Sequence, residues 1–99
     1  MTDAPYAPLC EVLARALEQA AQGKGADRHA NGQPFTDQPI LTISRMVGPG
    51  FAIGQVMKKA QEANTMARRG NSQNAVFELL GAINYLAAAV ILIEEEWRA

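Results

Sequence analysis

The sequence predicts a small all-α protein: an amino-terminal helix, a long polar loop and an antiparallel helical hairpin, assembled as a homo-oligomer. Apolar residues recur at helical spacing in three stretches, 8–22, 51–69 and 73–97. The β-branched run 40–47 has no second candidate strand to pair with, so a helix or turn is expected there. A chain of 99 residues is expected to form one domain over 1–99.

Composition argues against a nucleic-acid-binding, a disulfide-bonded and a secreted protein. Nine basic and ten acidic residues give a net charge of -1, which supplies no general attraction to nucleic acid. Cys10 is the only cysteine, so neither an intrachain disulfide nor a cysteine-built metal site is expected. The amino-terminal residues are acidic and interrupted by proline, unlike a secretion signal, and we expect a cytoplasmic protein.

The first helix, 8–22, should be amphipathic. Its apolar side chains fall on one side, at Leu9, Val12, Leu13, Ala16, Leu17 and Ala20. Gly23 follows the last periodic residue and is expected to end the helix.

The loop 23–39 contains three glycines and two prolines, which makes periodic structure unexpected. Loops of this length in compact domains are usually functional or disordered. Its basic residues Lys24, Arg28 and His29 are candidates for binding phosphate, and His29 or Asp37 could orient a catalytic water. The alternative is a solvated loop whose asparagines and glycines make turns.

The second helix, 51–69, follows a Gly-Pro-Gly sequence at 48–50. Free backbone N–H groups at a helix start favour an anion, and Lys58 and Lys59 lie on the same helix. The pattern lacks the Gly-Lys-Ser/Thr ending of a P-loop, and a plain Gly-Pro turn is the alternative. Gly70 can take a left-handed cap, so this helix and the next should form an antiparallel hairpin.

The last helix, 73–97, is apolar on nearly every face between residues 75 and 93 yet carries Glu78 and Asn84. Because a helix apolar all round must be covered all round, we expect a homo-oligomer that pairs through it, with Gly81 allowing close approach of a partner copy. The apolar run approaches the roughly 20 residues that cross a bilayer. Glu78 and the acidic flank at 94–96 argue against a membrane span.

Glu62 and Glu78 would face each other across the hairpin, where two carboxylates could hold Mg²⁺ together with substrate phosphates. The alternative is an ion pair between Glu78 and a basic side chain, for which the candidates are Arg28, Arg45, Lys58 and Lys59.

The segment KKAQEA at 58–63, followed by ELLGAINYL at 78–86, resembles the central helix pair of the MazG-like all-α nucleoside-triphosphate pyrophosphohydrolases. The segment GADRHANG at 25–32 is similar to the Gly-Ala-x-Lys-Tyr-Gly segment of small phage-type dATP/dGTP diphosphohydrolases. This resemblance implies a carboxylate Mg²⁺ site against a triphosphate, built from Glu-x-x-Glu and Glu-x-x-Asp pairs. Here Glu62 has Lys59 and Thr65 at that spacing and Glu78 has Gly81, so half of the implied metal ligands are absent.

These observations leave four functions open: a nucleotide hydrolase, a nucleotide-binding module without turnover, a phage-borne adaptor or inhibitor that docks on a protein partner, and a structural oligomer. The missing carboxylates favour binding over hydrolysis, so we predict that the chain binds a nucleotide or another phosphate-bearing ligand. The predicted ligand-binding residues are Lys24, Arg28, His29, Lys58, Lys59 and Asn84.

Overall fold

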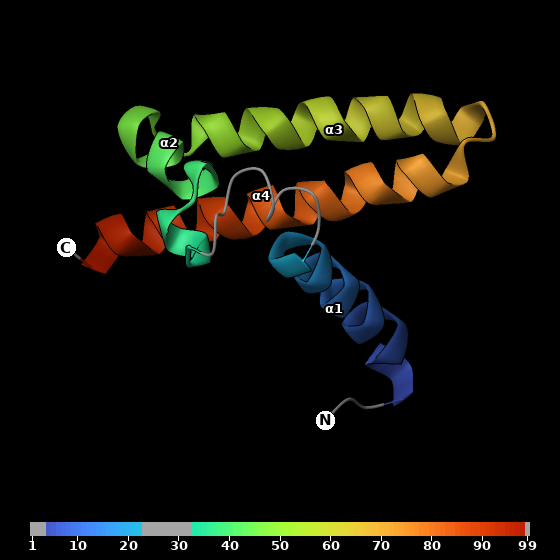
Figure 1. The fold of residues 1–99 in the computed structure, drawn as a ribbon, viewed down its shortest axis with the longest axis horizontal. Helices are drawn as coiled ribbons and strands as arrows, with labels where there is room; N and C mark the ends of the chain where they lie inside the picture. The colour runs from blue at the N-terminus through green and yellow to red at the C-terminus, as the bar shows by residue number, and fades with distance from the viewer. Residues whose placement is uncertain (1–3, 23–32, 99) are drawn as a thin grey trace.

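The structure, a computed structural model, describes residues 4–22 and 33–98 of the chain. A 3-10 turn (Ala4–Tyr6) leads into α1 (Ala7–Gln22), and a second 3-10 turn (Phe35–Asp37) precedes α2 (Pro39–Val47). Helices α3 (Gly50–Arg68) and α4 (Ser72–Arg98) complete the order. The described residues contain these four α-helices and no strand, which confirms the all-α prediction (Figure 1).

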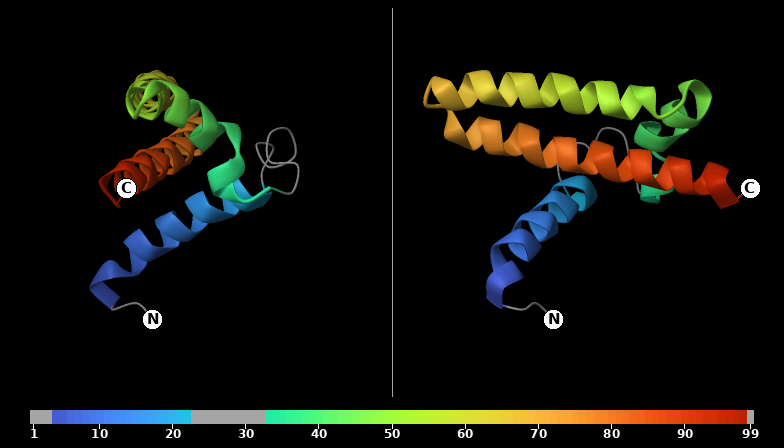
Figure 2. Two further views of the ribbon diagram at one scale, coloured as in Figure 1. Left: turned by 90° about the vertical axis from the view of Figure 1, so that its left-hand side faces the viewer. Right: turned by 180° about the vertical axis from the view of Figure 1, so that it is seen from behind.

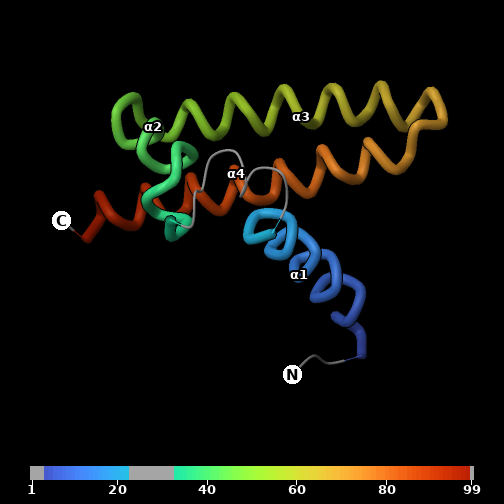
Figure 3. The backbone as a smooth tube through the Cα atoms, in the orientation of Figure 1, coloured from blue at the N-terminus to red at the C-terminus, as the bar shows by residue number. Residues whose placement is uncertain are grey.

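Helices α3 and α4 form the antiparallel hairpin that the sequence predicts, and they lie side by side along the long axis of the molecule (Figure 3). Gly70 takes a left-handed conformation, φ +81°. The Asn71 N–H donates to the Met66 carbonyl at 2.8 Å and the Gly70 N–H to the Ala67 carbonyl at 3.1 Å. This pair of bonds is the Schellman motif, which satisfies carbonyls at the end of α3 and turns the chain into α4.

The carboxyl-terminal part of the predicted loop 23–39 is structured, which corrects that prediction for residues 35–39. Phe35–Asp37 forms a 3-10 turn, and α2 begins at Pro39, where proline suits a first helical turn because its missing N–H has no partner to lose. The run 40–47 is helical, and Gly48 follows it with φ +94°. Leu41 from α2 is fully buried in one cluster with Ala88 and Leu92 of α4.

Helix α1 leaves the hairpin at an angle and packs only by its carboxyl-terminal half. It crosses α4 near the middle of that helix, and its amino-terminal end projects away from the hairpin (Figures 1 and 2). Ala16 is the one buried residue of α1. The apolar face that the sequence predicts is therefore only partly covered, since Leu9, Leu13 and Leu17 stay 48–68% exposed.

The buried core consists mainly of alanine. The buried apolar residues are Ala16, Leu41, Ala52, Ala63, Ala75, Leu80, Ala82, Ala88, Ala89 and Leu92. Small side chains let α3 and α4 approach closely, but each removes little apolar surface from water. The larger apolar side chains of the described residues mostly lie at the surface.

Helix α4 is long and apolar enough to cross a bilayer by length and composition, and 28% of its most apolar stretch is buried in the fold. The core helices of many soluble proteins are equally long and apolar. Length and composition alone therefore do not distinguish a membrane-spanning helix from a core helix.

Candidate functional site

The predicted site is only partly within the described structure. Lys24, Arg28 and His29 lie outside the described residues. The remaining candidates are distributed over three elements: Asp37 on the second 3-10 turn, Lys58, Lys59 and Glu62 on α3, and Glu78 and Asn84 on α4.

Lys59 and Glu78 form an ion pair across the hairpin. The Lys59 Nζ donates to Glu78 Oε1 at 3.2 Å, and both side chains are about one-fifth exposed, at 22% and 21%. The ammonium also lies 5.8 Å from the centroid of the Tyr85 ring, and that ring meets Phe51 edge-on. Of the four partners considered for Glu78, the structure selects Lys59.

Gly81 lies beneath the Lys59 side chain. A Cβ atom at Gly81 would lie 3.4 Å from the Cε and Nζ of Lys59. A close contact at this glycine is therefore made by α3 of the same chain, and approach of a partner copy there stays a prediction. Lys59 passes over the small residue to reach Glu78.

The described part of the chain contains no cluster of metal-binding side chains around Glu62 and Glu78. Glu78 faces Lys59, and Glu62 and Lys58 are exposed on α3. Within residues 4–22 and 33–98, no group of three or more His, Cys, Asp or Glu side chains could hold a metal ion. Mg²⁺ binding by Glu62 and Glu78 stays a prediction.

Asn84 joins α4 to α1. Its Nδ2 donates to the Ala16 carbonyl at 3.0 Å, and in the opposite direction Gln19 Nε2 donates to the Phe77 carbonyl at 3.2 Å. Each helix thus contributes a side-chain amide to the backbone of the other. The sequence assigns Asn84 to a ligand, but in the structure its side-chain amide is bonded to the backbone of α1.

An apolar groove opens beside this crossing. It encloses about 770 Å³, and Asn84 lies on its wall together with apolar side chains of α1, of the segment before α2 and of α4, including Leu13, Leu17, Phe35, Ile83 and Ile91. Phe35 is half-buried and packs against the cluster of Leu41, Ala88 and Leu92.

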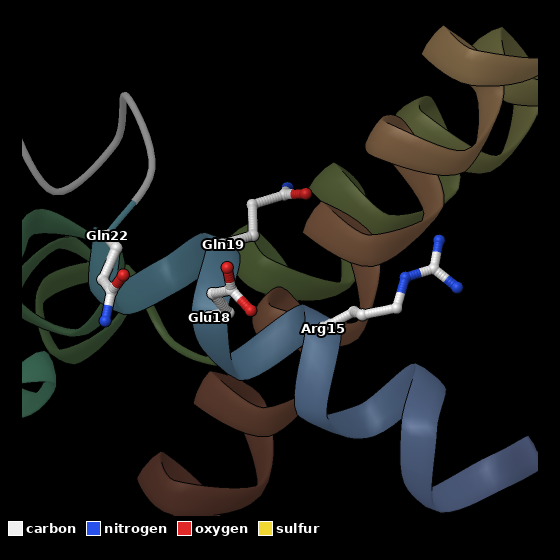
Figure 4. Close-up of a pocket in the computed structure, with 4 residues that line it drawn as sticks. All are labelled: Arg15, Glu18, Gln19 and Gln22. Atoms are coloured by element: carbon white, nitrogen blue, oxygen red, sulfur yellow. The ribbon is translucent and has the colours of Figure 1, made fainter.

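A second hollow lies on the polar side of α1, with a volume of about 350 Å³. Figure 4 shows its lining side chains, Arg15, Glu18, Gln19 and Gln22, pointing in different directions. They do not converge on a common point, and Gln19 is already bonded to α4.

Arg45 forms an ion pair with Glu95 that the sequence does not predict. Its guanidinium donates two hydrogen bonds to the Glu95 carboxylate, at 3.0 and 2.9 Å, and a third to the Thr36 carbonyl at 2.8 Å. The contact fastens α2 and the preceding turn to the end of α4. Fifty residues separate the two charges, so no local sequence signal pairs them.

The hydrogen bonds from Arg45 lower the pKa of the Glu95 carboxyl from its ordinary value of 4.5. The pKa of Arg45 is raised, mainly by the same hydrogen bonds, with a smaller contribution from the negative charge of Asp37. Since the Glu95 pKa is lowered in the folded state, the stabilisation is present above pH 4.5 and is lost as the pH falls through the lowered value.

Comparisons of the chain with family models, with curated proteins and with solved structures found no match. The resemblance to nucleotide pyrophosphohydrolases therefore depends only on the segments quoted for it.

Proposed function

We propose that this chain is a non-enzymatic self-assembly module whose exposed apolar faces on α1 and α4 are covered by other copies of the same chain. The observation that carries the proposal is that small apolar residues lie in the core while many large apolar residues lie at the surface. Within residues 4–22 and 33–98, seven of the ten buried apolar residues are alanine, and the large ones at the surface include Leu9, Leu13, Leu17, Val90 and Trp97. Globular proteins ordinarily bury leucine, isoleucine and valine most often.

The total exposed area supports the same proposal. The chain has an accessible surface of 7020 Å² at a mass of 10.7 kDa. A folded monomer of this mass exposes about 5,500 Å², so this chain exposes about 1,500 Å² more. A stable protein–protein interface buries about 800 Å² on each partner. The excess is therefore large enough for one interface and part of a second.

The polar candidates give less support to a catalytic function. Among the described residues, Lys59 is paired with Glu78, Asn84 bonds α1, and no group of three or more His, Cys, Asp or Glu side chains could hold a metal ion. A phosphate on Lys59 would have to compete with an ion pair that is already made. Nucleotide binding stays a prediction that depends mainly on Lys24, Arg28 and His29.

Sedimentation or light scattering tests the proposal through the molecular mass. We expect a multimer at micromolar concentration that Leu86→Lys converts to smaller species, because Leu86 is 48% exposed on the apolar face of α4 and a buried lysine without a partner opposes association. Gln61→Lys, at an exposed polar site on α3, is the matched control and should leave the mass unchanged. A folded monomer at every concentration would contradict the proposal.

A further inference from the structure

The exposed face of α4 carries a coiled-coil repeat. Apolar residues follow one another at alternating intervals of three and four: Val76, Leu79, Ile83, Leu86, Val90, Ile93 and Trp97. These residues are here named the α4 stripe. All except Ile83 are between 39% and 82% exposed, and the stripe spans three heptads, or about 32 Å of helix.

The stripe is distinct from the face of α4 that the chain itself covers. The buried positions Ala75, Ala82 and Ala89 recur every seven residues, each one position before a residue of the stripe. Position 81, beneath Lys59, lies on another side of the helix. One α4 surface is therefore covered by the chain, and a neighbouring surface keeps a heptad pattern that is exposed except at Ile83, which also lines the groove beside α1.

Charge distinguishes the two ends of the hairpin. Arg68 and Arg69 lie at the turn between α3 and α4, and both are exposed. At the other end of α4, Glu94 and Glu96 flank the stripe, while Glu95 is paired with Arg45. Two copies placed side by side in parallel would bring like charges together, whereas an antiparallel pair would bring each acidic end to the basic turn of the other copy.

An antiparallel pair also fits the repeat. In such pairs the a positions of one helix lie opposite the d positions of the other, and each knob enters a hole of the facing helix. If Val76 lies opposite Ile93 of the partner subunit, then Leu79 lies opposite Val90 of the partner subunit and Ile83 opposite Leu86 of the partner subunit. Trp97 then reaches the partner's basic turn, where a guanidinium can stack on an indole.

We propose that the covering protein is a second copy of this chain, paired antiparallel through the α4 stripe about a two-fold axis between residues 84 and 85. This inference rests on the proposed function and adds the orientation and register of the two copies. The surface is self-complementary under that axis, as a closed two-subunit interface requires. Ala87, an exposed small residue beside the stripe, leaves room for the partner helix to approach.

Disulfide cross-linking tests the direction of pairing. In a Cys10→Ser chain, Val76→Cys and Ile93→Cys are prepared as separate variants and oxidised alone and mixed, after light scattering has established that each is still a dimer. We expect a covalent dimer only in the mixture, joining one chain of each kind, and none with Gln61→Cys as the matched control.

The outcomes separate the two proposals. Cross-links in each single variant alone would indicate parallel pairing and overturn this inference, while the assembly proposal would stand. A dimer that none of these cysteines cross-links would also overturn it, because the seam would lie elsewhere. A monomeric parent chain would contradict the assembly proposal itself.

A charge exchange tests the same arrangement without a new covalent bond. Arg69→Glu and Glu96→Arg should each weaken the dimer, by about tenfold in Kd, because each creates two like-charge contacts in an antiparallel pair. The double variant Arg69→Glu/Glu96→Arg should restore the parent Kd, because the opposite charges meet again. Additive weakening in the double variant would overturn the antiparallel arrangement.

Discussion

Gly81 illustrates how one missing side chain positions a charge. The glycine lies in the middle of α4, where glycine costs about 1 kcal/mol relative to alanine. Its place is taken by the Lys59 side chain, which passes 3.4 Å from the position of a Cβ on its way to Glu78. Glycine is therefore explained at position 81 by the room it leaves for the Lys59 side chain, and not by the backbone conformations that glycine alone can adopt.

A pair of substitutions at this position separates helix propensity from the contact. Gly81→Ala should raise the free energy of unfolding by about 0.5–1 kcal/mol, because a methyl group fits at that distance. Gly81→Leu should be about 1–2 kcal/mol less stable than Gly81→Ala, because its larger side chain pushes Lys59 away from Glu78. Urea unfolding at neutral pH measures both.

Gly54 of α3 provides the control, since a Cβ there would have nothing within 4 Å. Alanine and leucine at position 54 should therefore agree within about 0.5 kcal/mol. Equal stability of the two variants at position 81 would show that the Lys59 contact has no energetic weight. A changed oligomer mass with Gly81→Ala would instead place the glycine at a subunit contact.

Among the elements, the long periodic helices were predicted with their bounds, whereas the short helix was predicted only as a helix or a turn. The sequence places α1, α3 and α4 within one or two residues of their observed bounds, because each has several turns of apolar periodicity and a glycine or proline near an end. Residues 40–47 are rich in β-branched side chains, and a run of this length fits a strand as well as a helix. Burial of Leu41 against Ala88 and Leu92 decides the helix, and that contact is tertiary.

In the candidate site, too, the sequence could not predict contacts between residues that are far apart in the chain. The sequence identified Glu78 as a group that needs a partner and included Lys59 among four possible ones. It assigned Asn84 to a ligand, although that side chain bonds a helix more than sixty residues away in the chain. The Arg45–Glu95 pair was not predicted, because several acidic residues were available and only the packing of α2 on α4 brings these two together.

The attachment of α1 depends on few contacts, and Asn84→Ala should loosen it. Removing the amide leaves the Ala16 carbonyl without that donor, which costs about 1 kcal/mol, or roughly a fivefold change in a local opening equilibrium. Hydrogen exchange should become about fivefold faster in α1 while the hairpin amides keep their protection.

Asn74→Ala, at an exposed position near the start of α4, is the control and should not change exchange in α1. A uniform increase across α3 and α4 with Asn84→Ala would contradict local detachment. It would indicate instead that Asn84 stabilises the molecule as a whole.

At the scale of the whole molecule, the shape is extended for the length of chain. The radius of gyration is 14.4 Å, whereas a compact chain of this length has about 13 Å. The projecting α1 and the 27-residue α4 account for this extension. Both helices keep large apolar side chains exposed, and the assembly proposal concerns these surfaces.

Nucleotide binding is tested on the whole protein by thermal shift. A nucleoside mono-, di- or triphosphate that binds only the folded state must raise Tm, and the sequence predicts such a rise. The double variant Arg28→Ala/His29→Ala should reduce the rise and keep the Tm of the free protein, with Arg68→Ala as a basic control outside the predicted set. A rise that requires Mg²⁺ would support the carboxylates Glu62 and Glu78.

No shift with any nucleotide, with or without Mg²⁺, would contradict the nucleotide prediction. It would leave the assembly proposal unaffected, since none of the residues of the α4 stripe belongs to the predicted ligand set.

The alanine-rich core has a consequence for how the sequence tolerates change. In an ordinary core, damage comes chiefly from truncation, which leaves cavities. In the described part of this chain, seven of the ten buried apolar positions are alanine, with a single methyl group, so truncation has little to remove. Damage at Ala52, Ala63, Ala75 or Ala88 comes from enlargement, which forces the helices apart at about 1–3 kcal/mol for each misfit. The interior of this protein therefore sets an upper limit on side-chain size, while its surface retains the large apolar residues.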